Sequence, residues 1–210
     1  MNPGGRTGFQ THPLDRTRKP ILAHKLHVIV ASTRPGRRGP SVARWFEGFA
    51  RQHGGFDPVL IDLAAFGLPV FDEPKHPAAR DYQHEHTRRW SASVAAADAY
   101  AFVMPEYNYF PPPSLVNALN YLVAEWAYKP AGLVSYGGVS GGLRAAQAVK
   151  LLLTTLKIMP IPEGVAVPNF QQFLDDAGTF RPNELIEKSA ATLLGELAKW
   201  SGALKPLRPG

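Results

Sequence analysis

The stretch Leu26–Ser41, LHVIVASTRPGRRGPS, decides the fold. Its first part, Leu26–Ala31, is a short and mainly apolar run of the kind that forms a strand buried on both faces of a sheet. The loop Ser32–Gly39 follows, and Pro40 suits the first turn of a helix because the N–H group that proline lacks is not needed there. The stretch therefore predicts a buried strand, a polar loop and a helix in succession.

The same succession of strand, loop and helix recurs along the chain. The predicted strands are Leu26–Ala31, Pro58–Leu63, Ala99–Met104, Ala131–Ser135 and Glu163–Pro168. The predicted helices are a first one from Pro40 to the Gly54–Gly55 pair, then Tyr82–Ala97, Ser114–Ala127, Leu143–Lys157 and residues 183–200 with Asn183 as N-cap. Residues 64–80 hold prolines and charges and are predicted as a surface loop. Five strands separated by helices imply a doubly wound parallel sheet with helices on both faces.

Length and charge indicate one globular domain preceded by a basic tail. The chain has 210 residues, of which 45% are hydrophobic and 19% are charged, as is ordinary for one folded domain. Residues 1–25 hold five basic groups and one acid, and so supply four of the six net positive charges. We expect residues 1–25 to be a flexible basic tail and residues 26–203 to form a single domain.

Composition excludes several classes of protein. The chain has no cysteine, which rules out disulfides, thiolate metal sites and a cysteine nucleophile. Its apolar runs are too short to cross a bilayer, and its N-terminus has no apolar stretch of the signal-sequence type. The charge outside the tail is small, and no basic patch is interleaved with aromatic residues. We therefore expect a cytoplasmic enzyme that binds neither membrane nor nucleic acid.

Three loops are predicted to meet at one edge of the sheet. Ligands of a doubly wound sheet bind beyond the carboxyl ends of its strands. The loops in that position are Ser32–Gly39, Pro105–Pro113 and Tyr136–Gly142, and all are rich in glycine, proline, serine or tyrosine. This coincidence predicts a ligand site at that edge.

The first of these loops has the chemistry of an anion site. It runs into a helix N-terminus, where free N–H groups and the helix dipole favour negative charge. The hydroxyl groups of Ser32, Thr33 and Ser41 can donate hydrogen bonds, and Arg34 can add a charge-assisted one. A phosphate monoester fits this chemistry. The alternative is a plain polar turn.

Two further arginines lie in the same loop. Arg37 and Arg38 are expected to point toward solvent or toward the phosphate of an incoming nucleotide. The loop is neither a Walker loop, which needs Gly-Lys-Ser/Thr, nor a GxGxxG dinucleotide fingerprint. The loop therefore matches neither of these two nucleotide-binding motifs, although its chemistry fits a phosphate.

The other two loops offer aromatic surface and accessible backbone. Tyr107 and Tyr109 would suit a planar heteroaromatic ligand, with Asn108 helping to form the turn, unless the tyrosines only pack the loop. The segment Gly137–Gly142, GGVSGG, has four glycines in six residues, which permits positive φ and close approach of a ligand. Its N–H groups can form a concave nest that stabilises a developing anion.

Three segments, in this order and spacing, resemble a known family. They are ASTRPGRRGPSVARWF (31–46), PEYNYFPPPSLVNALNYL (105–122) and SYGGVSGGLRAAQAVKLLL (135–153). Over about residues 26–170 the chain resembles the NADPH-dependent FMN reductases, which include flavodoxin-like quinone, chromate and azo-dye reductases. The resemblance implies a flavodoxin-like, three-layer α/β/α fold with five parallel strands in the order 2-1-3-4-5. It also implies bound FMN, with NADPH or NADH as co-substrate and FMN, a quinone or a similar small molecule as acceptor.

The resemblance assigns the cofactor to the same three loops. The first loop would hold the FMN phosphate, the second would line the isoalloxazine edge, and the glycines of the third would border the other side of the ring. The residues so implied are Ser32, Thr33, Arg34, Pro40, Ser41, Val42, Pro105, Glu106, Tyr107, Asn108, Tyr136, Gly137, Gly138 and Gly141. No catalytic side chain is implied, because the flavin carries the chemistry.

The resemblance also implies a homodimer or homotetramer, since relatives complete the flavin site with a partner subunit. The contact is expected at residues 64–90 and at the helix that carries Trp126 and Tyr128.

Three other functions are compatible with parts of the sequence. A flavodoxin-type electron carrier or FMN-binding sensor without turnover is the alternative, although such carriers tend to be acidic and this chain is basic. His76, His84 and His86 favour a solvated surface over a metal site, because the last two would point to different helical faces. A serine hydrolase is disfavoured, since no G-x-S-x-G elbow follows a strand and no histidine follows His86.

Overall fold

Five parallel strands form the centre of the computed structural model, which describes residues 24–208. The strands are β1 (His24–Val30), β2 (Phe56–Asp62), β3 (Ala99–Pro105), β4 (Pro130–Tyr136) and β5 (Met159–Val167). They pair in the order β2-β1-β3-β4-β5, which confirms the predicted doubly wound sheet. The predicted basic tail lies outside the described residues except for its last two, which begin β1.

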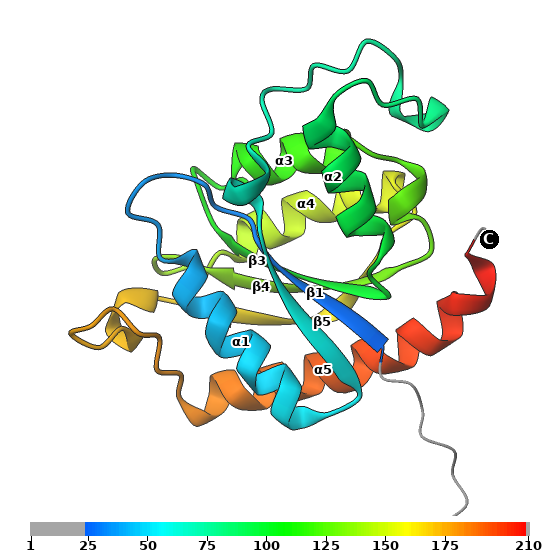
Figure 1. The fold of residues 1–210 in the computed structure, drawn as a ribbon. Helices are drawn as coiled ribbons and strands as arrows, with labels where there is room; N and C mark the ends of the chain where they lie inside the picture. The colour runs from blue at the N-terminus through cyan, green and yellow to red at the C-terminus, as the bar shows by residue number, and fades with distance from the viewer. Residues whose placement is uncertain (1–23, 209–210) are drawn as a thin grey trace, which may run out of the picture.

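Helices cover both faces of this sheet, as the three-layer prediction requires (Figure 1). They are α1 (Gly39–His53), α2 (Glu85–Ala95), α3 (Pro113–Asn120), α4 (Leu143–Thr155) and α5 (Glu184–Leu204). Helices α1 and α5 lie on one face, and α2, α3 and α4 lie on the other. Asn183 caps α5 as predicted, because its Oδ1 accepts a hydrogen bond from the Ile186 N–H at 3.0 Å.

Two apolar cores separate these layers from the sheet. Val28 and Phe46 belong to the core beneath α1 and α5, and Phe102 and Trp90 belong to the core beneath α2, α3 and α4. The central strands β3 and β4 are buried along their whole length. Burial on both faces explains why these strands read as continuous apolar runs and not as alternating patterns.

Helix α2 begins three residues later than predicted because a distant carboxylate holds the residues before it. The Glu73 carboxylate accepts hydrogen bonds from the N–H groups of Gln83, at 2.8 Å, and His84, at 3.1 Å. His84 has extended φ and ψ and is the N-cap of the helix. The prediction of a helix from Tyr82 is therefore wrong at its start, and Glu73 satisfies the N–H groups of the two residues that precede the first helical residue.

Helix α3 ends at Asn120, seven residues before the predicted end. Two tryptophan indoles take carbonyl groups of its last turn: Trp90 donates to the Ala118 carbonyl at 2.9 Å, and Trp126 donates to the Leu119 carbonyl at 3.2 Å. These bonds satisfy acceptors that a longer helix would have used, and Trp126 itself lies in the short 3-10 helix Ala124–Trp126.

Strand β5 starts four residues before its predicted first residue. It includes Pro160 and Pro162, which interrupt a strand pattern in sequence. Because β5 is the last strand of the sheet, one of its sides needs no ladder hydrogen bonds, and an edge strand tolerates proline there.

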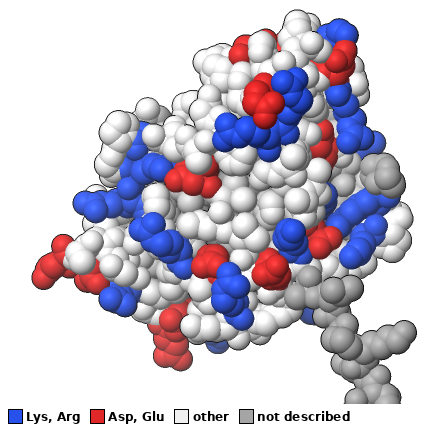
Figure 2. Space-filling model, in the orientation of Figure 1, with Lys and Arg blue, Asp and Glu red and all other residues white. Residues whose placement is uncertain are grey.

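The surface of the domain is mixed in charge. Figure 2 shows Lys and Arg interspersed with Asp and Glu over one face. Within residues 24–208, none of the helices combines the length and the apolar character that a membrane crossing needs.

Candidate functional site

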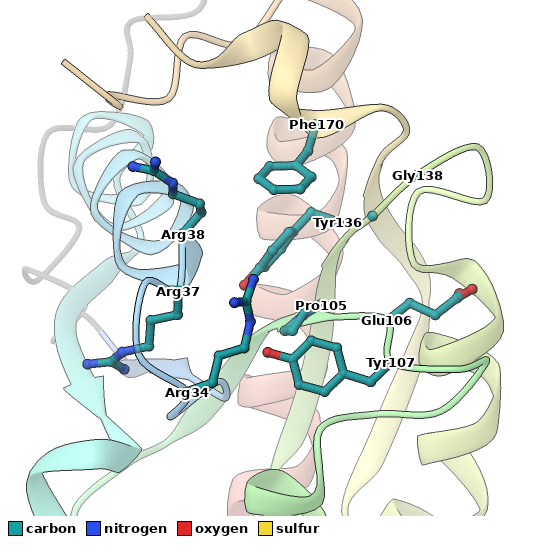
Figure 3. A pocket seen from close by; sticks show the side chains of 10 residues that line it. Arg34, Arg37, Arg38, Pro105, Glu106, Tyr107, Tyr136, Gly138 and Phe170 are labelled. Carbon is teal, nitrogen blue, oxygen red and sulfur yellow. The ribbon is translucent and has the colours of Figure 1, made fainter. Parts of the chain in front are cut away.

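A pocket opens at the carboxyl ends of β1, β3 and β4, where the three predicted loops meet (Figure 3). Its lining residues are Arg34, Arg37, Arg38, Pro105, Glu106, Tyr107, Tyr136, Gly137, Gly138 and Phe170. The sheet positions them together, because residues 31, 105 and 136 end or follow neighbouring parallel strands.

Half of the predicted cofactor residues line this pocket, and the other half do not. Those in the lining are Arg34, Pro105, Glu106, Tyr107, Tyr136, Gly137 and Gly138. Thr33 instead lines a neighbouring hollow beside Leu68 and Ser114, and Val42 is fully buried in the core. Asn108 and Gly141 shape the loops through positive φ angles of 50° and 61°.

The hydroxyl groups predicted for the first loop are partly in use already. Ser41 Oγ donates to the Gly178 carbonyl at 2.9 Å and accepts from the Phe180 N–H at 2.8 Å, so it ties helix α1 to the segment before α5. Ser32 is fully buried, with its Oγ 3.5 Å from the Tyr136 hydroxyl. The loop therefore offers a ligand mainly its backbone and its arginines.

The three arginines of the loop differ in direction. Figure 3 shows Arg34 reaching across the pocket toward Tyr136, whereas the side chain of Arg38, at the start of α1, points back over that helix. Within the described chain neither has a carboxylate within 4.0 Å. Arg37 turns away from the pocket and forms an ion pair with Asp62. The prediction that Arg37 points to solvent or to a nucleotide is therefore wrong.

Glu106 faces away from the pocket centre and caps helix α4 (Figure 3). Its carboxylate accepts hydrogen bonds from the N–H groups of Arg144, at 3.1 Å, and Ala145, at 3.4 Å. Burial raises the pKa of the Glu106 carboxyl, but hydrogen bonds from Ser140, Arg144 and these N–H groups outweigh burial and hold that pKa below its usual value. Glu106 thus joins the second loop to the third.

The second loop is a tight turn with aromatic walls. The Tyr107 N–H donates to the Phe110 carbonyl at 2.9 Å and the Phe110 N–H donates back at 3.0 Å. Between them Asn108 and Tyr109 have positive φ angles of 50° and 71°. The Arg144 guanidinium lies 4.3 Å from the centroid of the Tyr109 ring, which packs the first turn of α4 against the second loop.

The glycine loop uses part of its backbone internally. The N–H groups of Gly137, Gly141 and Gly142 donate to Val167 O, Gly138 O and Ser140 Oγ at 3.2, 3.0 and 3.3 Å. Among residues 24–208, the N–H groups of Gly138–Ser140 have no acceptor. The predicted nest is therefore limited to these three.

Sequence reasoning missed Phe170 in the lining. The Phe170 and Tyr136 rings have centroids 5.1 Å apart and close one wall of the pocket. Phe170 follows β5, and the available signal was that the carboxyl end of this strand must reach the same edge as the other four.

The histidine-rich segment lies elsewhere. The rings of His84 and His86 stack 5.2 Å apart, and both face Asp72. The expectation that they point to different helical faces is wrong, because His84 precedes α2 and is not helical. Across the described residues, no group of three or more His, Cys, Asp or Glu side chains is arranged to hold a metal ion.

Known proteins resemble this chain in sequence and in fold. The model of the family described as NADPH-dependent FMN reductase matches residues 24–172. An NAD(P)H-dependent FMN reductase of Schizosaccharomyces pombe is 33% identical over 192 residues, which cover 89% of this chain and 91% of that protein. A quinone reductase of Pseudomonas putida is 26% identical, over 84% of this chain and 94% of the relative.

A solved structure extends the likeness to the whole fold. The flavoenzyme NAD(P)H:(acceptor) oxidoreductase FerB of Paracoccus denitrificans superimposes with a TM-score of 0.67 at 20% identity, covering 86% of this chain and 98% of FerB. Together with the match over residues 24–172, these relatives establish that the chain belongs to the NADPH-dependent FMN reductase family.

Proposed function

We propose that FMN occupies the pocket between the three loops, and that the enzyme uses NAD(P)H to pass two electrons through it to a quinone or a similar small acceptor. Family membership supports the FMN and NAD(P)H dependence of this oxidoreductase. The observation that carries the placement is a difference between the two helix N-termini at this edge. Helix α4 is capped by Glu106, whereas α1 has no side-chain cap and no acidic residue in its first turn.

The α1 end of the pocket fits a phosphate. An uncapped helix N-terminus carries partial positive charge, which favours an anion. Arg34 and Arg38 flank this end without carboxylate partners in the described chain. We therefore place the FMN phosphate beside α1 and not beside α4, where the carboxylate of Glu106 would repel it.

The opposite end of the pocket fits a planar ring. Tyr107, Tyr136 and Pro105 supply flat apolar surface, and Gly138 lets the backbone approach closely. The unpaired N–H groups of Gly138–Ser140 are donors for the polar edge of the ring. Bound FMN supplies the redox chemistry, namely hydride acceptance from NAD(P)H and two-electron transfer to an acceptor. The protein orients it.

The test is the spectrum and turnover of the purified protein. We expect it to be yellow, or to quench FMN fluorescence with micromolar or better affinity, and to oxidise NADPH in the presence of a benzoquinone. Binding without turnover would favour the electron-carrier alternative. A colourless protein that does not quench FMN would refute the placement of FMN in this pocket.

We propose further that the protein is a homodimer, or a dimer of such dimers. Trp126 is excluded from the contact because it is fully buried against Trp90 and Tyr100. Tyr128, the other residue expected there, is half-buried and follows the 3-10 helix that ends at Trp126.

The expectation of a contact at residues 64–90 is supported by an open hollow of about 900 Å³ lined by Val70, Phe71 and Phe110. Val70 and Phe110, which line it, are 87% and 64% exposed, an unusual amount for large apolar side chains at one place.

Light scattering coupled to gel filtration should give twice the 22.9 kDa chain mass or a multiple of that. Val70→Lys is expected to shift the protein toward monomer, because a charge would be buried in the contact. Leu185→Lys is the matched control, since Leu185 is 71% exposed on α5, on the other face of the sheet. A wild-type protein that remains monomeric at micromolar concentration would contradict the proposal.

A further inference from the structure

Arg37 differs from the other two arginines of the β1–α1 loop in what it contacts. Its side chain forms a bidentate ion pair with Asp62, the last residue of β2, with Nη1–Oδ1 at 2.6 Å and Nη2–Oδ2 at 2.7 Å. The two side chains are 20% and 32% exposed, so the pair is largely shielded from solvent. A planar guanidinium that matches a carboxylate in this way fixes both groups in one geometry.

Asp62 is itself a fixed anchor. Its Oδ1 also accepts a hydrogen bond from the Ala64 N–H at 3.1 Å and so caps the short 3-10 helix Leu63–Phe66. The hydrogen bond from Arg37 holds the pKa of the Asp62 carboxyl below its usual value, so the carboxylate is ionised at neutral pH. Because β2 pairs with β1, Arg37 is tied to the strand beside the one that its own loop leaves.

Arg37 also holds the backbone of the loop. Its Nη1 donates a hydrogen bond to the Ser32 carbonyl at 2.7 Å. The peptide bond is planar and trans, so the Thr33 N–H points opposite to the Ser32 carbonyl. This N–H has no acceptor within residues 24–208. Since the guanidinium holds the Ser32 carbonyl, the free Thr33 N–H points away from the Arg37 side chain and is available to a ligand.

We propose that Arg37 is a positioning residue for the FMN phosphate. Anchored by Asp62, it fixes the Ser32–Thr33 peptide so that the Thr33 N–H is presented to the phosphate, and it acts through this peptide, since its guanidinium is bound to Asp62 and to the Ser32 carbonyl. This inference rests on the proposed function, namely on FMN in this pocket with its phosphate at this loop.

Neutralising Asp62 tests the proposal, because simple electrostatics and positioning by Arg37 predict opposite changes in FMN affinity. Simple electrostatics makes Asp62 unfavourable for a nearby phosphate, so neutralising it should strengthen FMN binding. Positioning by Arg37 requires the opposite, because the loss of the carboxylate releases the guanidinium and with it the Ser32 carbonyl. Asp62→Asn therefore distinguishes the two effects.

The experiment is a titration of the full chain, freed of flavin, with FMN and with riboflavin. Asp62→Asn and Arg37→Lys are each expected to weaken FMN binding by about tenfold, because lysine keeps the charge but cannot span both carboxylate oxygens and the carbonyl. Riboflavin binding should change by less than about twofold. Asp57→Asn is the matched control, since Asp57 lies at the other end of β2 with its side chain 61% exposed.

Each outcome decides the proposal. FMN binding to Asp62→Asn that is as tight as wild type, or tighter, overturns it, and so does full FMN affinity in Arg37→Lys. If Asp62→Asn fails to fold, which loss of riboflavin binding and of the cooperative thermal transition would reveal, Arg37→Lys decides alone. A wild-type protein that does not bind FMN refutes the proposed function instead.

Discussion

Replacing Arg34 by alanine is expected to weaken FMN binding by roughly ten- to a hundredfold and to leave riboflavin binding nearly unchanged. Arg34 reaches across the pocket and lacks a carboxylate partner in the described chain, so its guanidinium is free to bind an anion. A charge-assisted hydrogen bond contributes about 1.5–3 kcal/mol, and about 1.4 kcal/mol corresponds to tenfold in affinity. Riboflavin has no phosphate and should not respond.

Isothermal titration with both flavins, at low and high salt, measures this effect. The loss in Arg34→Ala should shrink as salt increases, because Arg34 is exposed and its charge is screened. Arg44→Ala is the matched control: it removes the same charge from an exposed position on α1 outside the pocket. An equal loss of FMN and riboflavin in Arg34→Ala, or no loss of either, would remove the phosphate from this residue.

The place of the Ser32–Gly39 loop could be predicted from sequence, but the roles of its arginines could not. Its position at the end of a buried strand, and so at the edge where ligands bind, follows from the pattern of apolar runs. The roles of its three arginines do not follow. Arg37 is distinguished from Arg34 and Arg38 only by Asp62, which is 25 residues away along the chain.

Ser41 illustrates the same limit. A hydroxyl at the first turn of a helix is a good phosphate donor by local chemistry. The partners that Ser41 contacts instead, Gly178 and Phe180, follow it by 137 and 139 residues. Local pattern determines that a donor is present, but only the packing of α1 beside the segment before α5 determines what it binds.

Element ends were predicted less well than element order for a related reason. Strand order depends on apolar runs and crossover handedness, which are properties of whole segments. Helix ends depend on single hydrogen bonds from distant residues, as with Glu73 before α2 and the Trp90 and Trp126 indoles after α3. No local sequence motif at those helix ends predicts these hydrogen-bond partners.

Gly142→Ala is expected to destabilise the folded state strongly, with a loss of about 3–5 kcal/mol in the free energy of unfolding. Gly142 is the N-cap of α4 with a φ of +80°, a conformation that costs alanine energy by itself. A Cβ there would lie 2.8 Å from Ser135 Cβ and 2.9 Å from the Tyr136 backbone N. These atoms belong to the buried strand β4 and cannot move aside.

Gly142→Ala should therefore also weaken FMN binding, because it displaces the 137–142 segment that borders the pocket. Relieving the overlap means lifting the 137–142 segment off β4, which breaks the 2.9 Å hydrogen bond from Ser135 Oγ to the Gly141 carbonyl. Urea unfolding monitored by circular dichroism measures the stability, and FMN titration measures the site. For the unfolding measurement, Gly138→Ala is the matched control in the same loop, because its Cβ would meet no atom within 4 Å and its φ is not positive. Equal unfolding midpoints for Gly142→Ala and wild type would contradict this prediction. They would show that the 137–142 segment moves to accommodate the Cβ, and that contact with β4 does not fix its conformation.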